Sequence, residues 1–202
     1  MLLCCVSSVP RHNFPVLLAS TISGDPAFEA ICTRLTGDKT PLGANGLWGS
    51  AAPVTAALLS DKTGRPLLYL TAHPDQADDA RDDMETILGR PVELFPAWET
   101  LPGEGSAAGE INTQRAGLCS YLLESTRGRR REERPTVIVV PIQALMQPAP
   151  SPESLDANTL TLQTGEAREP EDVAAFLAQR GFERLDQVEE PGDFALRGGI
   201  LD

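Results

Sequence analysis

Residues 67–70 (LLYL), 92–95 (VELF) and 137–140 (VIVV) decide the fold. The first and the last are apolar throughout, as in strands that are covered on both faces, and each run has the length of a strand. Residues 75–88 and 111–124, which lie between these runs, carry apolar side chains at helical spacing. Strands that alternate with helices in this way predict an α/β fold in which a parallel sheet is flanked by helices.

The first 43 residues are predicted to be a lead-in and a first helix. Residues 1–23 show no clear periodicity. Asp25 and Pro26 are typical of the N-cap and the first position of a helix, and apolar side chains then recur at helical spacing until Gly37. We therefore expect the α/β domain to begin near residue 44.

A glycine-rich segment precedes the next predicted helix. Residues 46–49 are expected to be the end of a short strand and a turn, and residues 50–60 a helix with Ser50 as its cap. A phosphate-binding loop occupies such a place and reads G-x-x-x-x-G-K-[ST]. With the first glycine of that pattern at residue 46, alanines replace the second glycine and the lysine, and proline replaces the hydroxyl residue. The positions concerned are Gly46, Gly49, Ser50, Ala51, Ala52 and Pro53.

This segment lacks the chemistry of nucleotide hydrolysis. Ala52 brings no positive charge to the lysine position, and Pro53 brings neither a hydroxyl nor a backbone N–H. Two interpretations stay open, an ordinary glycine-rich turn or a phosphate loop that has lost its function. In both we expect no catalytic residue, no cofactor and no metal, although the start of the helix would still attract an anion weakly.

The composition excludes several classes of protein. The chain has 202 residues, 41% of them hydrophobic, with 17 basic and 29 acidic side chains and a formal net charge of -12. The apolar fraction is too high for a disordered chain, and no apolar run approaches the roughly 20 residues that span a bilayer. The acidic balance disfavours a generic nucleic-acid binder, which needs a basic face.

The cysteines and the amino terminus favour a cytoplasmic protein. Cys4, Cys5, Cys32 and Cys119 form no C-x-x-C pair, and the two histidines are far apart, so the spacing of zinc ligands is absent. The apolar start of the chain has no basic segment before it, which argues against a signal peptide. We expect reduced thiols and no association with a membrane.

A change of pattern near residue 150 predicts a second, smaller unit. Residues 147–158 are rich in proline, serine and aspartate and are expected to form a linker. Beyond them the pattern predicts one helix and three alternating, strand-like segments, over 170–180, 159–163, 182–188 and 194–201. These elements indicate an α+β unit. Because the chain stops directly after a strand, we expect this unit to be truncated.

Trp98 and the basic run that starts at Arg127 have ordinary structural interpretations. Trp98 stands beside Pro96 in a loop, and we interpret it as a packed anchor rather than as a residue that stacks on a base. The arginines at 127 and 129–131 are followed by Glu132 and Glu133. We interpret this run as a solvated loop rather than as a nucleic-acid site.

Five segments, taken in order, resemble the bacterial transcription-repair coupling factors (Mfd). They are residues 46–51 (GLWGSA), 95–102 (FPAWETLP), 139–141 with 145–147 (VVP, LMQ), 181–182 with Val188 (GF, V), and 191–202 (PGDFALRGGILD). The second and the last are specific in combination. The resemblance runs from about residue 44 to 202, and it is to the amino-terminal module of that family, which is similar to the nucleotide-excision-repair protein UvrB.

The resemblance implies a division of the chain and a set of partners. Residues 44–157 would form a helicase-like α/β domain with a degenerate phosphate loop, and residues 158–202 the first part of a domain that docks the nucleotide-excision-repair protein UvrA. Members of the family are ATP-dependent DNA translocases that displace RNA polymerase stalled at a lesion. This module would contact UvrA and other domains of the parent protein, and would reach RNA polymerase and DNA only through absent downstream domains.

The resemblance also implies one docking residue, Arg197, on which the arginine of the family's R-G motif falls. Arg197 stands between Leu196 and two glycines and is expected to project from a strand with little cover. Such an arginine can dock onto an acidic partner through paired hydrogen bonds. The alternative for this residue is a solvated arginine on an edge strand. The alternatives for the whole chain are a nucleotide-binding helicase-like domain and a direct DNA-binding module.

Overall fold

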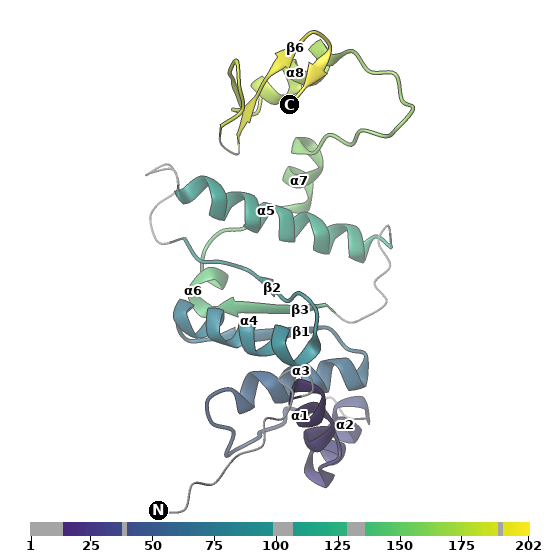
Figure 1. The fold of residues 1–202 in the computed structure, drawn as a ribbon, viewed down its shortest axis with the longest axis vertical. Coiled ribbons are helices and arrows are strands. Elements are labelled where there is room, and N and C mark those ends of the chain that lie inside the picture. Colours follow the sequence, from purple (N-terminus) through teal and green to yellow (C-terminus); the bar gives the residue numbers. More distant parts are fainter. Residues whose placement is uncertain (1–13, 38–39, 99–106, 129–135, 190–191) are drawn as a thin grey trace, which may run out of the picture. The chain divides into compact units, whose positions relative to one another are not determined.

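The computed structural model describes residues 14–37, 40–98, 107–128, 136–189 and 192–202. The chain forms two compact units, residues 1–97 with 130–146 and residues 98–129 with 147–202. Helices and short strands make up both units (Figure 1). None of the helices within the described ranges has both the length and the apolar character that crossing a membrane demands.

The first unit is built on the parallel sheet that the sequence predicts. Its strands are β1 (Leu67–Thr71), β3 (Val137–Pro141) and β2 (Glu93–Leu94), in that order across the sheet. Every residue of the central strand β3 is buried, which accounts for its uninterrupted apolar sequence. This small parallel sheet with its helices confirms the mixed helix-and-strand class predicted from the sequence.

β1 differs from the expectation that both of its faces are covered. Leu68 and Leu70 keep 54% and 50% of their surface exposed, whereas Tyr69 packs against the core. β1 is an edge strand, and successive side chains of a strand point to opposite faces. The apolar run therefore identified the strand but did not reveal how many of its faces are covered.

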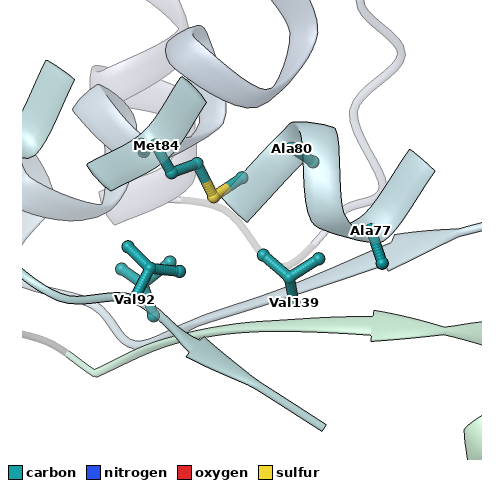
Figure 2. Close-up of a cluster of buried hydrophobic side chains, with 7 residues drawn as sticks. Ala77, Ala80, Met84, Val92 and Val139 are labelled. Atoms are coloured by element: carbon teal, nitrogen blue, oxygen red, sulfur yellow. The ribbon is translucent and has the colours of Figure 1, made fainter. Parts of the chain in front are cut away.

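The main core of this unit lies between the sheet and α4 (Pro74–Leu88). Ala77, Ala80 and Met84 recur at helical spacing on α4 and are buried against Val92 and Val139 (Figure 2). As predicted, α4 ends at Gly89. The φ of this glycine is 63°, a left-handed conformation that takes the backbone out of the helix. The amphipathic pattern of α4 thus fixed both its extent and its buried face.

Among the residues that the structure describes, three helices precede β1, one more than the sequence predicts. These are α1 (Phe14–Ser23), α2 (Pro26–Gly37) and α3 (Ala51–Thr63). Most residues of α1 are apolar, so it has no clear polar face from which a period could be recognised. Asp25 caps α2 as expected, since its Oδ1 accepts the N–H of Ala27 at 2.7 Å. A second core forms here from Phe28, Cys32, Val54 and Leu58.

The segment in front of α3 contains no strand. Residues 41–48 have no regular secondary structure, and Gly49 and Ser50 form a turn. The strand end expected within 46–49 was therefore wrong, whereas the expected turn is present at Gly49. The Ser50 side chain does not cap α3. A phosphate-binding loop connects a strand directly to a helix, and this segment has no such strand.

The second unit contains α5 (Ala107–Thr126), α7 (Pro152–Asn158) and α8 (Pro170–Ala178), while α6 (Ile142–Leu145) follows β3 in the first unit. α7 corrects the expectation that residues 147–158 are only a linker. Ser151 caps it by accepting the N–H of Ser154 at 3.2 Å, and Pro152 occupies its first turn. These are helix-start residues, which the proline-rich composition concealed.

The carboxyl-terminal strands are shorter and more sharply bent than the sequence predicts. β4 (Glu183–Arg184) pairs in parallel with β5 (Asp193–Phe194), and β6 (Leu196–Arg197) pairs in antiparallel fashion with β7 (Ile200–Leu201). Residues 194–201 are therefore not one strand but a strand end followed by a hairpin. Residues 159–163, expected to be a strand, have no regular structure.

Candidate functional site

Arg197 lies at the tip of the hairpin formed by β6 and β7. Gly198 and Gly199 make its two-residue turn, with φ angles of 55° and 86°. Positive φ at both positions is typical of a type I′ turn, which fits the twist of a hairpin and favours glycine. The register pairs Arg197 directly with Ile200. Two glycines between strand-like residues are a hairpin signal, so the sequence did contain the information that links these two residues.

The Arg197 side chain is exposed, as the sequence predicts. Its Nη2 lies 3.5 Å from Oδ2 of Asp202, and the two side chains keep 63% and 53% of their surface exposed. An ion pair so exposed contributes little stability. A guanidinium carries five N–H donors, so Arg197 retains the capacity for paired hydrogen bonds with a carboxylate of a partner.

Ile200 adds an apolar side chain to the same hairpin tip. It keeps 65% of its surface exposed, although a large aliphatic side chain is usually buried. Sequence reasoning did not single out Ile200, because residues 194–201 were expected to form one strand rather than the hairpin that places Ile200 opposite Arg197. The tip therefore offers a cation and an apolar group side by side.

The base of the hairpin is held by buried residues. Phe194 and Ala195 are buried, and the backbones of Ala195 and Asp202 exchange two hydrogen bonds of 3.1 and 2.9 Å. The hairpin also contacts α8, whose Val173 and Ala174 are buried. This arrangement fixes the base of the hairpin while its tip is exposed, which suits a docking element.

The glycine-rich turn before α3 does not form a phosphate cradle. Three of its N–H groups donate to nearby carbonyls, Ala51 to Trp48, Ala52 to Gly49 and Val54 to Ser50, at 3.1, 3.4 and 3.1 Å. Pro53 has no N–H. A phosphate site needs such groups directed at the anion. Gly46 and Gly49 have φ angles of 85° and 52°, so their role is to shape the backbone of the turn.

Trp98 is packed, in agreement with its interpretation as an anchor. Its backbone N–H and C=O bond the side-chain amide of Gln147 at 2.8 and 2.9 Å, and its Nε1 donates to Asn112. The guanidinium of Arg115 lies 4.4 Å from the centre of the indole ring. Arg115 is only 2% exposed, and its burial lowers its pKa. Sequence reasoning missed Arg115, which looks like an ordinary charge on a helix.

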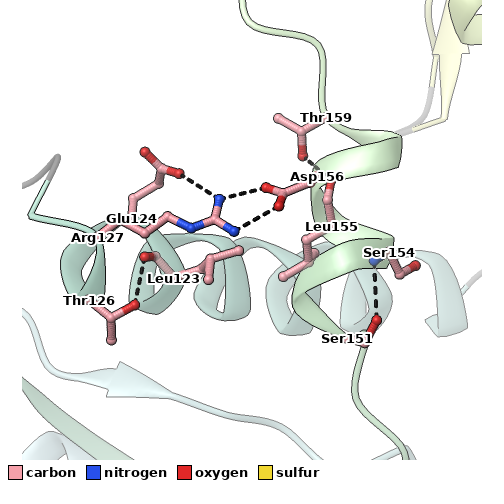
Figure 3. A network of polar contacts seen from close by, with 9 residues as sticks. All are labelled: Leu123, Glu124, Thr126, Arg127, Ser151, Ser154, Leu155, Asp156 and Thr159. Carbon is pink, nitrogen blue, oxygen red and sulfur yellow. Dashed lines mark hydrogen bonds and ion pairs between the residues drawn. The ribbon is translucent and has the colours of Figure 1, made fainter.

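Arg127 is the one arginine of the basic run that the described residues include. It forms two hydrogen bonds with the Asp156 carboxylate, of 2.6 and 2.7 Å, and lies 3.9 Å from Glu124 (Figure 3). Its hydrogen bond with Asp156 raises the pKa of Arg127. Arg127 therefore contributes to the contact of α5 with α7, whereas the arginines at 129–131 lie outside the described residues.

Neither a metal centre nor a reactive thiol stands out in the described part of the chain. No group of three or more His, Cys, Asp or Glu side chains there is arranged to hold a metal ion. Cys32 is buried and Cys119 half-buried, and burial raises the pKa of both thiols. A raised pKa lowers the thiolate fraction and hence the reactivity.

Comparisons with known proteins match both units. A model of the UvrB interaction domain family matches residues 160–202, the segment that contains the hairpin. Transcription-repair-coupling factors of Bacillus subtilis (strain 168), Mycobacterium tuberculosis (strain CDC 1551 / Oshkosh) and Escherichia coli (strain K12) are 34%, 33% and 26% identical to this chain. These alignments cover 78%, 75% and 77% of it. They confirm the resemblance that the sequence motifs indicate.

The relatives are much longer than this chain. The chain spans 13% of the Bacillus and Escherichia proteins and 12% of the Mycobacterium protein. Arg197 lies within the segment matched by the UvrB interaction domain, whereas the glycine-rich turn before α3 lies outside it. The two candidate sites also belong to different compact units, so each has to be judged by itself.

Proposed function

We propose that this chain, a homologue of the transcription-repair-coupling factors that carries a UvrB interaction domain, is a non-catalytic docking module. In this proposal it recruits the repair protein UvrA to RNA polymerase stalled at DNA damage. One observation carries the proposal: Arg197, exposed at the tip of a hairpin, lies within the segment that matches the interaction domain.

The chemistry of the hairpin tip indicates what the docking surface of UvrA should offer. Arg197 would bond a carboxylate, because a guanidinium and a carboxylate form two parallel hydrogen bonds. Ile200, directly opposite, would enter a shallow apolar depression beside that carboxylate. An arginine next to an apolar group is typical of the residues that dominate binding energy in protein interfaces.

A non-catalytic role agrees with the turn before α3. We interpret residues 46–53 as a phosphate loop that has lost its function in a helicase-like domain, since Ala52 lacks a charge and Pro53 lacks an N–H donor. In titrations with a fluorescent ATP analogue, we expect no saturable binding. Saturable binding in the micromolar range would instead support a nucleotide-binding domain.

In this proposal, parts of such longer proteins that lie outside this chain carry out the other functions, namely binding DNA and RNA polymerase. The module itself would meet UvrA and neighbouring domains. The family division, with a helicase-like domain over 44–157 and the first part of the docking domain over 158–202, is part of the same proposal. The chain would act in the cytoplasm with no bound cofactor.

Binding to UvrA tests the proposal. Immobilised UvrA should retain the purified chain, and Arg197→Ala should weaken that binding by about tenfold or more, as expected for an arginine at the centre of an interface. Arg168→Ala is a matched control, because Arg168 also forms an exposed ion pair, at 3.1 Å from Glu166. Equal binding by the wild-type chain and both variants would refute the role assigned to Arg197.

A further inference from the structure

A groove of about 600 Å³ lies in the first unit where the start of α3, the carboxyl end of β1 and α4 meet. Its lining includes the apolar side chains of Leu47, Pro53 and Leu70. Carboxylates of α4, among them Asp79 and Asp83, also line it. None of the described residues that line it is a lysine, arginine or histidine, so the lining combines apolar side chains with negative charge.

Asp79, Asp82 and Asp83 of α4 line the groove and Asp78 does not, and these aspartates differ in their partners. Arg81 lies 3.6 and 3.1 Å from the carboxylates of Asp78 and Asp82. Asp79 and Asp83 have no cationic partner among the residues that the structure describes. Tyr69, which also lines the groove, has a pKa raised by burial and by the nearby Asp83 carboxylate. A cation that entered the groove would therefore meet two carboxylates without displacing an internal ion pair.

Trp48 stands in the chain between two residues that line the groove, although it is not itself a lining residue. Those two residues are Leu47 and Gly49, and 84% of the Trp48 surface is exposed. A tryptophan so exposed is unusual on a protein surface, and its ring attracts cations. A second, mostly apolar hollow of about 430 Å³ shares Leu47, Ala52 and Tyr69 with the groove. The apolar surface therefore continues from the groove into this hollow, which Arg34 also lines.

We propose that this groove binds a peptide segment of a partner protein in which arginines stand next to aliphatic residues. An arginine would stack on Trp48 and bond Asp79 or Asp83, and an aliphatic neighbour would fill the hollow beside Leu47. Phosphate groups are excluded by the carboxylates and by the internally bonded N–H groups of the turn. The groove belongs to a different unit from Arg197, so this interaction goes beyond docking through the hairpin.

A model peptide tests this proposal with the full chain. Fluorescence anisotropy would follow a fluorescein-labelled peptide that alternates leucine and arginine, and we expect saturable binding that Trp48→Ala weakens by about fivefold or more. Asp79→Asn with Asp83→Asn keeps the shape of both side chains and should weaken binding by about tenfold or more, as expected for paired charges. A peptide that alternates leucine and glutamate should not bind.

A second pair of substitutions separates the groove from general electrostatic attraction. Asp75→Asn with Asp78→Asn removes the same charge from α4 at positions that do not line the groove, and it should change the affinity by less than about twofold. Circular dichroism would establish that each variant is folded. Equal losses for the two pairs, no effect of Trp48→Ala, or no binding of the arginine peptide up to about 1 mM would each overturn the proposal.

Discussion

At the scale of single residues, Arg115 is the best test of how the second unit is held together. Its guanidinium is buried against Trp98, and one Nη donates to the Pro148 carbonyl at 2.9 Å. Arg115→Ala would leave a cavity and an unpaired carbonyl, so we expect the free energy of unfolding to fall by about 2–4 kcal/mol. Urea denaturation measures this change, with Arg168→Ala as an exposed control that should shift it by less than about 0.5 kcal/mol. If both variants lowered the free energy of unfolding by a similarly small amount, the role of Arg115 as a buried anchor would be contradicted.

The thiols give a second prediction at this scale. Burial raises the pKa of Cys32 and Cys119 above the ordinary value of 9.0, so at neutral pH the folded chain should react with iodoacetamide about tenfold more slowly at both thiols than the unfolded chain. Mass spectrometry of the labelled peptides measures each rate. Because the folded state holds these protons more tightly, stability should fall as the pH rises above about 9. Equal labelling of the two states would count against burial of the thiols.

At the scale of elements, we expect the replacement of glycine by alanine to have opposite effects on stability in the hairpin turn and in α5. Gly199 has a φ of 86° in the hairpin turn, whereas Gly117 lies in the interior of α5, and an added Cβ would meet no atom within 4 Å at either position. Gly199→Ala should cost about 1–2 kcal/mol through backbone strain. Gly117→Ala should stabilise the chain by about 1 kcal/mol because alanine favours a helix. Thermal denaturation distinguishes the two, and the same sign for both would exclude this account of the turn.

The elements that the sequence predicted correctly have a regular periodicity or an unbroken apolar run. Residues 74–88 alternate buried and exposed positions with a helical period, and residues 137–140 are buried on both faces. α1 has no clear polar face, and α7 lies in a segment rich in proline and serine, so neither has a pattern of this kind. The site was predicted in part: the resemblance gave Arg197, whereas the place of Ile200 depends on strand register and the burial of Arg115 on tertiary packing.

At the scale of the whole molecule, the net charge of -12 argues against direct DNA binding by this chain. Binding to the phosphate backbone depends on many basic contacts. Of the arginines at 127 and 129–131, only Arg127 lies within the described residues, and its guanidinium bonds the Asp156 carboxylate. Anisotropy with a fluorescent damaged duplex should therefore show no salt-dependent binding at about 0.15 M salt. Binding that weakens steeply with added salt would support the DNA-binding alternative.

The central claim is that the hairpin of residues 195–202 is the surface that docks UvrA. Hydrogen–deuterium exchange of the chain, with and without UvrA, tests it most directly because exchange locates a contact without altering a residue. We predict that UvrA slows exchange at the backbone amides of the hairpin turn, from Arg197 to Ile200, and leaves those of α4 unchanged. If UvrA binds while exchange at the hairpin stays the same, the claim is contradicted.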